Sequence, residues 1–242
     1  MRRFRILLAL MALMALTAGA ENKNYIIRVL DYSPAPGQFI NTTPQYVEGE
    51  PLDSLLARVL WNITGRYIYE TYDRERFTLD PDCLMTCIRE GGAKVPTGKT
   101  RGDKTYKRSS QSNILIDGEL DFTVNGSHIP VAPFRELMHQ QGSGLDFGAQ
   151  LKLAEEHGFE LLVKRAKINM SKHVRVRPLF RNWQITCTLT VLDEEGSGLT
   201  KDVLEKIFQQ AGTYCGLGDW RPSSPKSPGT FGTFTATLEA IG

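Results

Sequence analysis

Three consecutive apolar patterns near the C-terminus, within residues 184–238, constrain the fold more than any other part of the chain. Residues 184–192 alternate between apolar side chains and threonines, which indicates a strand with one buried face. Residues 200–211 place apolar side chains at helical spacing, and Gly212 is suited to end that helix. Residues 233–238 alternate again. The sequence therefore predicts a strand, a helix and a closing strand in this order.

A glycine-rich loop with the sequence GLGDWRPSSPKSPGTFG, residues 216–232, joins the predicted helix to the closing strand. Glycines in such a loop allow a positive φ or a close approach between two backbone segments. We expect Arg221 to be ion-paired and Trp220 to be packed, which would fix the loop, and Arg221 is also a candidate contact for an anionic ligand. The candidate loop glycines are Gly216, Gly218, Gly229 and Gly232.

A strand, a helix and a strand that follows a glycine-rich loop make up half of a βαββαβ unit, so we expect an α+β fold with a ferredoxin-like core, as in RNA-recognition motifs. The glycine-rich loop resembles that of the RAMP superfamily, which includes the guide-RNA-binding backbone subunits of CRISPR effector complexes. RVRPLFRNW at residues 175–183, GLGDWRP at 216–222 and GTFGTF at 229–234 together resemble a family of uncharacterised phage and prophage proteins. The resemblance implies a RAMP-like domain, which we place at residues 63–242.

The N-terminus has the pattern of a secretory signal peptide. Arginines precede an apolar run that is short for a membrane span, and Ala18-Gly19-Ala20 matches a cleavage site. Residues 1–20 are therefore predicted to be removed, with an uncleaved anchor as the alternative, and we expect no stable membrane span after cleavage. Residues 21–62 are predicted as an extended segment with a strand at Tyr25–Leu30 and a linker helix that begins near Pro51.

Two locations for the protein follow from two resemblances. Residues 1–50, with the segment RVLDYSPAPGQFIN, resemble the signal peptide and mature N-terminus of secreted, surface-associated proteins of Bacteroidales bacteria. That resemblance implies an exported protein, periplasmic or on the surface, with an adhesive or structural role. The phage-family resemblance implies a cytoplasmic protein instead. A fusion of two unrelated halves, with a seam near Leu52–Leu60, would account for both resemblances.

Two segments concentrate positive charge, although the formal net charge of the chain is only +2. Residues 92–110 hold six basic residues and one acid, and their glycines and small polar residues predict a mobile loop inserted in the domain. Residues 164–181 contain no acid, and their VRVRP stretch predicts a strand with arginines on one face. Phosphates of single-stranded RNA or DNA are the ligand that such charge favours. The candidate contacts are Lys99, Arg101, Lys104, Lys107, Arg108, Arg175, Arg177 and Arg221.

Each basic segment also has a purely structural interpretation. The first would be a solvated loop, and the second an edge strand that charge protects against aggregation. If both segments instead line one groove, their cations contact phosphates rather than base edges. Binding would then depend weakly on nucleotide sequence and strongly on salt.

Between the basic segments the sequence predicts three elements. Residues 113–129 indicate a hairpin or a pair of strands around Asp117-Gly118 and Asn125-Gly126. Residues 151–157 are predicted to form a short helix that Gly158 ends, and a strand follows from Phe159.

No pattern in the chain indicates a catalytic or metal site. Nucleophile-elbow and zinc-protease motifs are absent, and the histidines are scattered. Cys83 and Cys87 lie four residues apart in a helix predicted at residues 80–91, without a second ligand pair at matching spacing, and are interpreted as small core residues. The cysteines would be able to pair in an exported chain and would be thiols in a cytoplasmic one. We therefore expect a non-enzymatic binding protein without a cofactor, and a homo-oligomer remains open.

Overall fold

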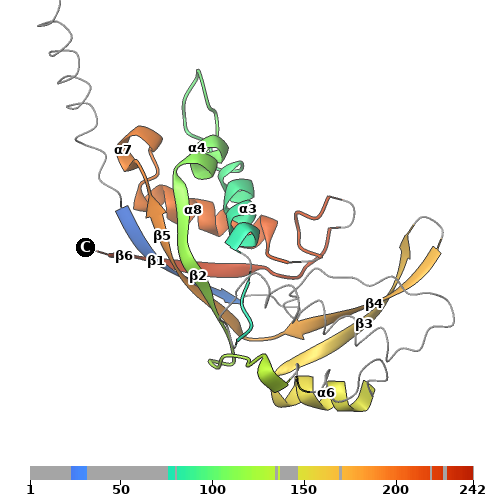
Figure 1. Ribbon diagram of the computed structural model, residues 1–242. Coiled ribbons are helices and arrows are strands. Elements are labelled where there is room, and N and C mark those ends of the chain that lie inside the picture. Colours follow the sequence, from blue (N-terminus) through green and yellow to red (C-terminus); the bar gives the residue numbers. More distant parts are fainter. Residues whose placement is uncertain are drawn as a thin grey trace, which may run out of the picture.

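The computed structural model describes residues 23–31, 76–79, 81–133, 136, 147–168, 171–218, 220–225 and 228–241. These residues form a four-stranded antiparallel sheet with helices on one face and a separate two-stranded ribbon, so the predicted α+β class is confirmed (Figure 1). The signal peptide, the linker helix and the seam near Leu52–Leu60 lie outside the described residues. In the part that is described, no helix has the length and apolar character needed to cross a membrane.

The four-stranded sheet has the strand order β2-β5-β1-β6, and every neighbouring pair is antiparallel. Its strands are β1 (Lys23–Asp31), β2 (Ile114–Val124), β5 (Trp183–Val191) and β6 (Phe234–Ile241). The chain passes from β1 to β2 through helices α3 (Pro81–Gly92) and α4 (Lys107–Ser112), and from β5 to β6 through α7 (Glu194–Ser197) and α8 (Lys201–Gln210). Both edge strands therefore follow a helical crossover.

Strand β1 lies in the middle of the sheet. It pairs with β5 on one side and with β6 on the other, and Tyr25, Ile27 and Val29 are buried. The strand predicted at Tyr25–Leu30 is confirmed, but its position differs from the expectation of a segment attached to a domain that begins at residue 63. Its alternating apolar residues predicted a strand, whereas its partners are distant in sequence and left no local signal.

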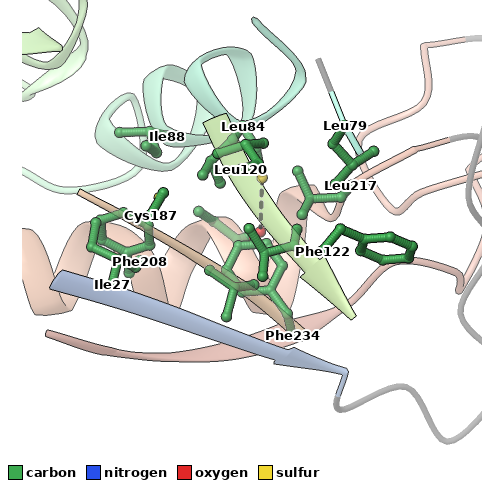
Figure 2. Packing of buried hydrophobic residues seen from close by; sticks show 14 of the residues in the cluster. Ile27, Leu79, Leu84, Ile88, Leu120, Phe122, Cys187, Phe208, Leu217 and Phe234 are labelled. Atoms are coloured by element: carbon green, nitrogen blue, oxygen red, sulfur yellow. Dashed lines mark hydrogen bonds between the residues drawn. The ribbon is translucent and has the colours of Figure 1, made fainter. Parts of the chain in front are cut away.

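Strand β5 and helix α8 form the best-predicted part of the core. Ile185, Cys187 and Leu189 are buried on one face of β5, as their alternation predicted. Helix α8 buries Leu204, Ile207 and Phe208, which belong to the same cluster. Figure 2 shows Phe208 among the buried side chains, together with Ile27 of β1 and Ile88 of α3. Burial of this helix face against the sheet joins the two helical crossovers in one core.

Helix α8 ends at Gln210, as predicted, but Gly212 does not end the helical stretch. The helix continues as a π-helical turn, η1 (Ala211–Cys215), and ends before Gly216, whose φ of 72° is left-handed. Gly212 is required for another reason, because a Cβ at this position would overlap the carbonyl oxygen of Phe234. The glycine therefore allows strand β6 to pass close to the π turn.

The first basic segment is more ordered than predicted. Its last residues begin helix α4, and Pro96 forms an isolated β-bridge with Thr105, so only the part between them is a loop. Ser110 is fully buried, and a Cβ on Gly92 would overlap its hydroxyl. The close contact between α3 and α4 explains why a small-residue sequence that favoured a loop forms a helix here.

Strand β2 is a single strand rather than the predicted hairpin. Its register with β5 shifts between Asp117 and Asp121, so the Asp117-Gly118 pair marks a bulge instead of a turn. The turn comes at Asn125-Gly126, where both residues have positive φ, 50° and 77°. Buried apolar residues continue beyond the bulge and keep the strand in the sheet.

The second sheet is a ribbon of two strands, β3 (Phe159–Ile168) and β4 (Ser171–Phe180), which follows helix α6 (Phe147–Glu156). The strand predicted from Phe159 and the helix predicted at residues 151–157 are confirmed. At its base, the ring of Phe180 lies 5.2 Å from that of Phe159 and 5.2 Å from that of Phe122 of β2. The ribbon projects from the sheet beyond these rings (Figure 1).

Candidate nucleic-acid interface

The pairing of β3 with β4 divides the basic residues of the second segment between the two faces of the ribbon, with the larger arginine group on one of them. Lys164 lies opposite Arg175, and His173 and Arg177 are the alternate residues on either side of Arg175. Opposed residues of an antiparallel pair share a face, and so do alternate residues of one strand. We call positions 164, 173, 175 and 177 the basic ribbon face. The alternation of VRVRP predicted the arginine positions, whereas Lys164 joins them only through the register.

The opposite face of the ribbon is apolar near its base. Phe159 and Phe180 form an opposed pair that is buried in the core, and Val163 lies opposite Val176 on the same face farther out. Toward the far end of the ribbon this face carries Arg165, Lys167 and Lys172, so both faces hold basic residues there.

Like charges oppose one another along the ribbon. Lys164 lies opposite Arg175, and Lys167 lies opposite Lys172. Directly opposed like charges destabilise a strand pair, and an isolated two-stranded hairpin is only marginally stable in water. A polyanion on the basic ribbon face would remove the repulsion between Lys164 and Arg175.

The one acid of the ribbon is already paired. Arg181 donates from Nε to Oε1 of Glu160 at 2.7 Å and from Nη2 to Oε2 at 3.3 Å. This hydrogen bonding lowers the pKa of Glu160 and keeps its carboxylate ionised. Glu160 therefore neutralises Arg181 rather than the basic ribbon face.

The first basic segment lies elsewhere in the molecule. Lys99, Arg101 and Lys104 are exposed in the loop between α3 and α4, and Lys107 and Arg108 are exposed on α4. Figure 1 shows this loop and the ribbon at different ends of the fold. The expected groove lined by both basic segments is therefore not formed, and the two segments lie on separate surfaces.

Arg221 serves the glycine-rich loop itself. Its Nη2 lies 3.6 Å from Oε1 of Glu90, its Nε donates to the Ser223 hydroxyl at 2.9 Å, and its Nη1 donates to the Gly218 carbonyl at 3.1 Å. The ring of the neighbouring Trp220 packs against that of Phe231, with centroids 5.7 Å apart. The expectation of a paired arginine and a packed tryptophan is confirmed, and Arg221 is occupied within the protein.

The loop glycines have the backbone roles that the sequence predicted. Gly216, Gly218 and Gly232 have φ of 72°, 74° and 70°, which favours glycine, and a Cβ on Gly229 would overlap the carbonyl oxygen of Trp220. The loop is further held by a 2.8 Å hydrogen bond from the Leu217 amide to the Gly232 carbonyl. These glycines therefore allow the backbone turns and close contacts that give the loop its conformation.

A second cationic site lies beside this loop. A pocket of about 580 Å³ is lined by Arg89, Lys94, Lys107, Gln111 and Ser223 among others. Lys94 and Lys107 belong to the first basic segment, whereas Arg89 and Ser223 come from α3 and the glycine-rich loop. Sequence analysis missed this pocket because its lining comes from three stretches that are far apart along the chain.

In comparisons with known proteins, neither a family model nor a curated protein matches this chain.

The reactivity of the cysteine thiols tests which of them the core buries. None of the four cysteines forms a disulfide. Cys87, Cys187 and Cys215 are buried, whereas Cys83 is exposed, so its interpretation as a core residue is wrong. Burial raises the pKa of Cys187 to about 12 and that of Cys215 to about 11. We expect one thiol to react rapidly with Ellman's reagent in the native protein, and the Cys83→Ser variant to lose this rapid reaction. Rapid modification of several thiols in that variant would contradict the described core.

Proposed function

We propose that this protein binds single-stranded nucleic acid, RNA or DNA, without catalysing a reaction, and that it holds the strand on the basic ribbon face. The observation that carries the proposal is the β3–β4 register, which places Lys164, Arg175 and Arg177 on one face of a projecting ribbon. Lysine and arginine side chains neutralise phosphates and release their counterions, which supplies most of the affinity of such binding.

The fold that we propose for the four-stranded sheet is ferredoxin-like and RAMP-like. The order β2-β5-β1-β6 and the helical crossovers from β1 to β2 and from β5 to β6 support this proposal, because they describe a βαββαβ unit. Helix α6 and the ribbon would then be an insertion between its second and third strands. The glycine-rich loop before β6 is the feature that resembles the phage family, which supports a role as a phage-type accessory or assembly subunit.

The sheet face away from the helices supports contact with the nucleic-acid backbone rather than with bases. It carries threonines, such as Thr186, Thr188 and Thr237, at positions that alternate with buried residues. Its Arg28 is paired with Glu239 at 3.0 Å. Base stacking on a sheet needs exposed aromatic rings, whereas the residues just named on this face are threonines and an ion pair. We therefore expect affinity to depend on phosphate contacts and only weakly on nucleotide sequence.

The decisive experiment is a fluorescence-anisotropy titration with a single-stranded oligonucleotide at several salt concentrations. For single strands the slope of log K against log salt is about −0.7 per neutralised phosphate. The double variant Arg175→Ala, Arg177→Ala should therefore give a slope shallower by about 1.4 than that of the unchanged protein. Both residues lie in the ribbon, away from the buried sheet, so we expect the thermal midpoint to change little.

The double variant Lys99→Ala, Lys104→Ala is the matched control. It removes the same charge from the loop between α3 and α4, and we expect its salt slope to equal that of the unchanged protein. An absence of binding at low salt would reject the proposal. Equal slopes for the ribbon variant and the unchanged protein would remove the basic ribbon face from it.

The signal-peptide pattern of residues 1–20 supports a second candidate, an exported protein with an adhesive or structural role. The two candidates differ in location, because an exported chain cannot serve a nucleic-acid complex inside the cell. Cell fractionation with N-terminal sequencing of the product separates them. A chain that begins at Glu21 in the periplasm or on the surface favours export, and an intact Met1 in the cytoplasm favours the phage-type role.

A further inference from the structure

The pocket beside the glycine-rich loop has walls that close packing holds in place. Helix α3 ends in Gly91 and Gly92, and both are buried. A Cβ on Gly91 would lie 2.6 Å from the carbonyl oxygen of Ile207, and a Cβ on Gly92 would overlap the hydroxyl of Ser110. The end of α3 is thus held against α8 on one side and against α4 on the other. The pocket is therefore formed before any ligand arrives, which lowers the entropic cost of binding.

The charge of this pocket is positive. Arg89, Lys94 and Lys107 line it, and within the described part of the chain none of them has an ion-pair partner. The one acid in the lining is Glu90, which pairs with Arg221 at 3.6 Å and accepts a hydrogen bond from the Ser223 hydroxyl at 2.5 Å. Glu90 is neutralised in this way, so the cations retain their capacity for an anion.

The remaining lining adds polar groups without adding negative charge. Gln111 of α4 can donate from its side-chain amide, whereas the Ser223 hydroxyl already donates its proton to Glu90. Cys215 also lines the pocket, and burial raises its thiol pKa to about 11, so this thiol is neutral at pH 7. Three cations and an amide around a space of about 580 Å³ suit an anion that carries a larger polar group.

We propose that this pocket binds the phosphate group of a nucleotide, either a free mononucleotide or the terminal nucleotide of a strand. Arg89, Lys94 and Lys107 contact the phosphate, and Gln111 contacts the sugar or base. The choice of a nucleotide as the phosphate carrier rests on the proposed function, whereas the anion site itself rests on the pocket. The site is separate from the basic ribbon face, because its lining comes from α3, α4, the π turn and the glycine-rich loop.

The test is calorimetric titration of the full chain at low salt with AMP, with adenosine and with inorganic phosphate. We expect AMP to bind, inorganic phosphate to compete with it, and adenosine to bind at least about tenfold more weakly because it lacks the charged group. The double variant Lys94→Gln, Lys107→Gln removes two exposed cations and should weaken AMP binding about tenfold or more. Its thermal midpoint should match that of the unchanged protein.

Two control variants isolate the pocket. Lys99→Gln, Lys104→Gln removes the same charge from the neighbouring loop and should leave AMP affinity within about twofold, since exposed charges that do not touch the ligand contribute little. Arg175→Ala, Arg177→Ala should leave AMP affinity unchanged even though it weakens strand binding. These variants therefore distinguish a failure of the proposal for the basic ribbon face from a failure of the proposal for the pocket.

Oligonucleotides with and without a 5′-phosphate distinguish the two sources of the phosphate. Tighter binding of the phosphorylated oligonucleotide, lost in Lys94→Gln, Lys107→Gln, assigns the pocket to a strand end. Binding of AMP without that difference assigns it to a free nucleotide. The proposal is overturned if AMP does not bind, if adenosine binds as tightly, or if the pocket variant keeps its AMP affinity.

Discussion

The Gly232→Val variant is expected to lose about 3 kcal/mol or more of its free energy of unfolding, well beyond the roughly 0.5–1 kcal/mol of a simple propensity change. Gly232 has a φ of 70°, a conformation in which a β-branched residue is a clear outlier. A Cβ at this position would also overlap the carbonyl oxygen of Leu217, whose amide donates to the Gly232 carbonyl at 2.8 Å. The valine therefore has to displace the backbone that it is hydrogen-bonded to.

Thermal or urea denaturation measures this effect, and Gly98→Val is the matched control. Gly98 has a similar φ of 73°, but nothing lies within 4 Å of a Cβ built on it. A valine at position 98 would be strained by the positive φ but would collide with no neighbouring atom. Because the exposed loop around it can relax, we expect this variant to lose less than about 1 kcal/mol of its free energy of unfolding. An unchanged midpoint for Gly232→Val would show that the glycine-rich loop adapts freely.

The Phe180→Ala variant should lose about 3–5 kcal/mol of stability, as is typical when a large aromatic side chain is removed from a packed core. Phe180 is fully buried at the end of β4. Its ring meets that of Phe122 edge-on at 5.2 Å and that of Phe159 at 5.2 Å, so one side chain joins the ribbon to the four-stranded sheet. The alanine would leave a cavity and would remove the contacts of Phe180 with the rings of Phe122 and Phe159.

Urea denaturation checks the loss, with Leu115→Ala as a control that removes a leucine side chain with a relative exposure of 48% from the edge strand β2. We expect the control to stay within about 0.5 kcal/mol of the unchanged protein. Amide hydrogen exchange should also become faster along β3 and β4 in Phe180→Ala. A large loss of stability with unchanged exchange in these strands would show that other contacts hold the ribbon.

The sequence predicted elements whose signal is local. Strand β5 and helix α8 have apolar residues at the period of their secondary structure, and both were placed correctly. Gly212 was assigned to a helix end because glycine often takes that role, but its neighbour is Phe234 of a later strand. Asp117-Gly118 has the composition of a turn, yet the apolar residues that follow it continue the same strand. In both cases a contact that is not local decided the structure.

The candidate sites also combine features that local sequence patterns predict with features that depend on contacts between distant residues. Alternation placed Arg175 and Arg177 on one face without any knowledge of the partner strand. The addition of Lys164 needed the register of β3 with β4, and the pocket needed the packing of α3 against both α4 and α8. Residue type therefore indicated an anionic ligand, whereas the assignment of each cation to the ribbon or to the pocket required the structure.

The central place of β1 has a consequence for the order of folding events. Arg28 of this strand is paired with Glu239 of β6, a separation of 211 residues. During synthesis on the ribosome, β1 emerges long before either of its neighbours and cannot enter the sheet until β5 and β6 have followed. Contacts at such separations make folding slow. The sheet therefore closes late, and until then the apolar face of β1 lacks the neighbouring strands that cover it in the folded protein.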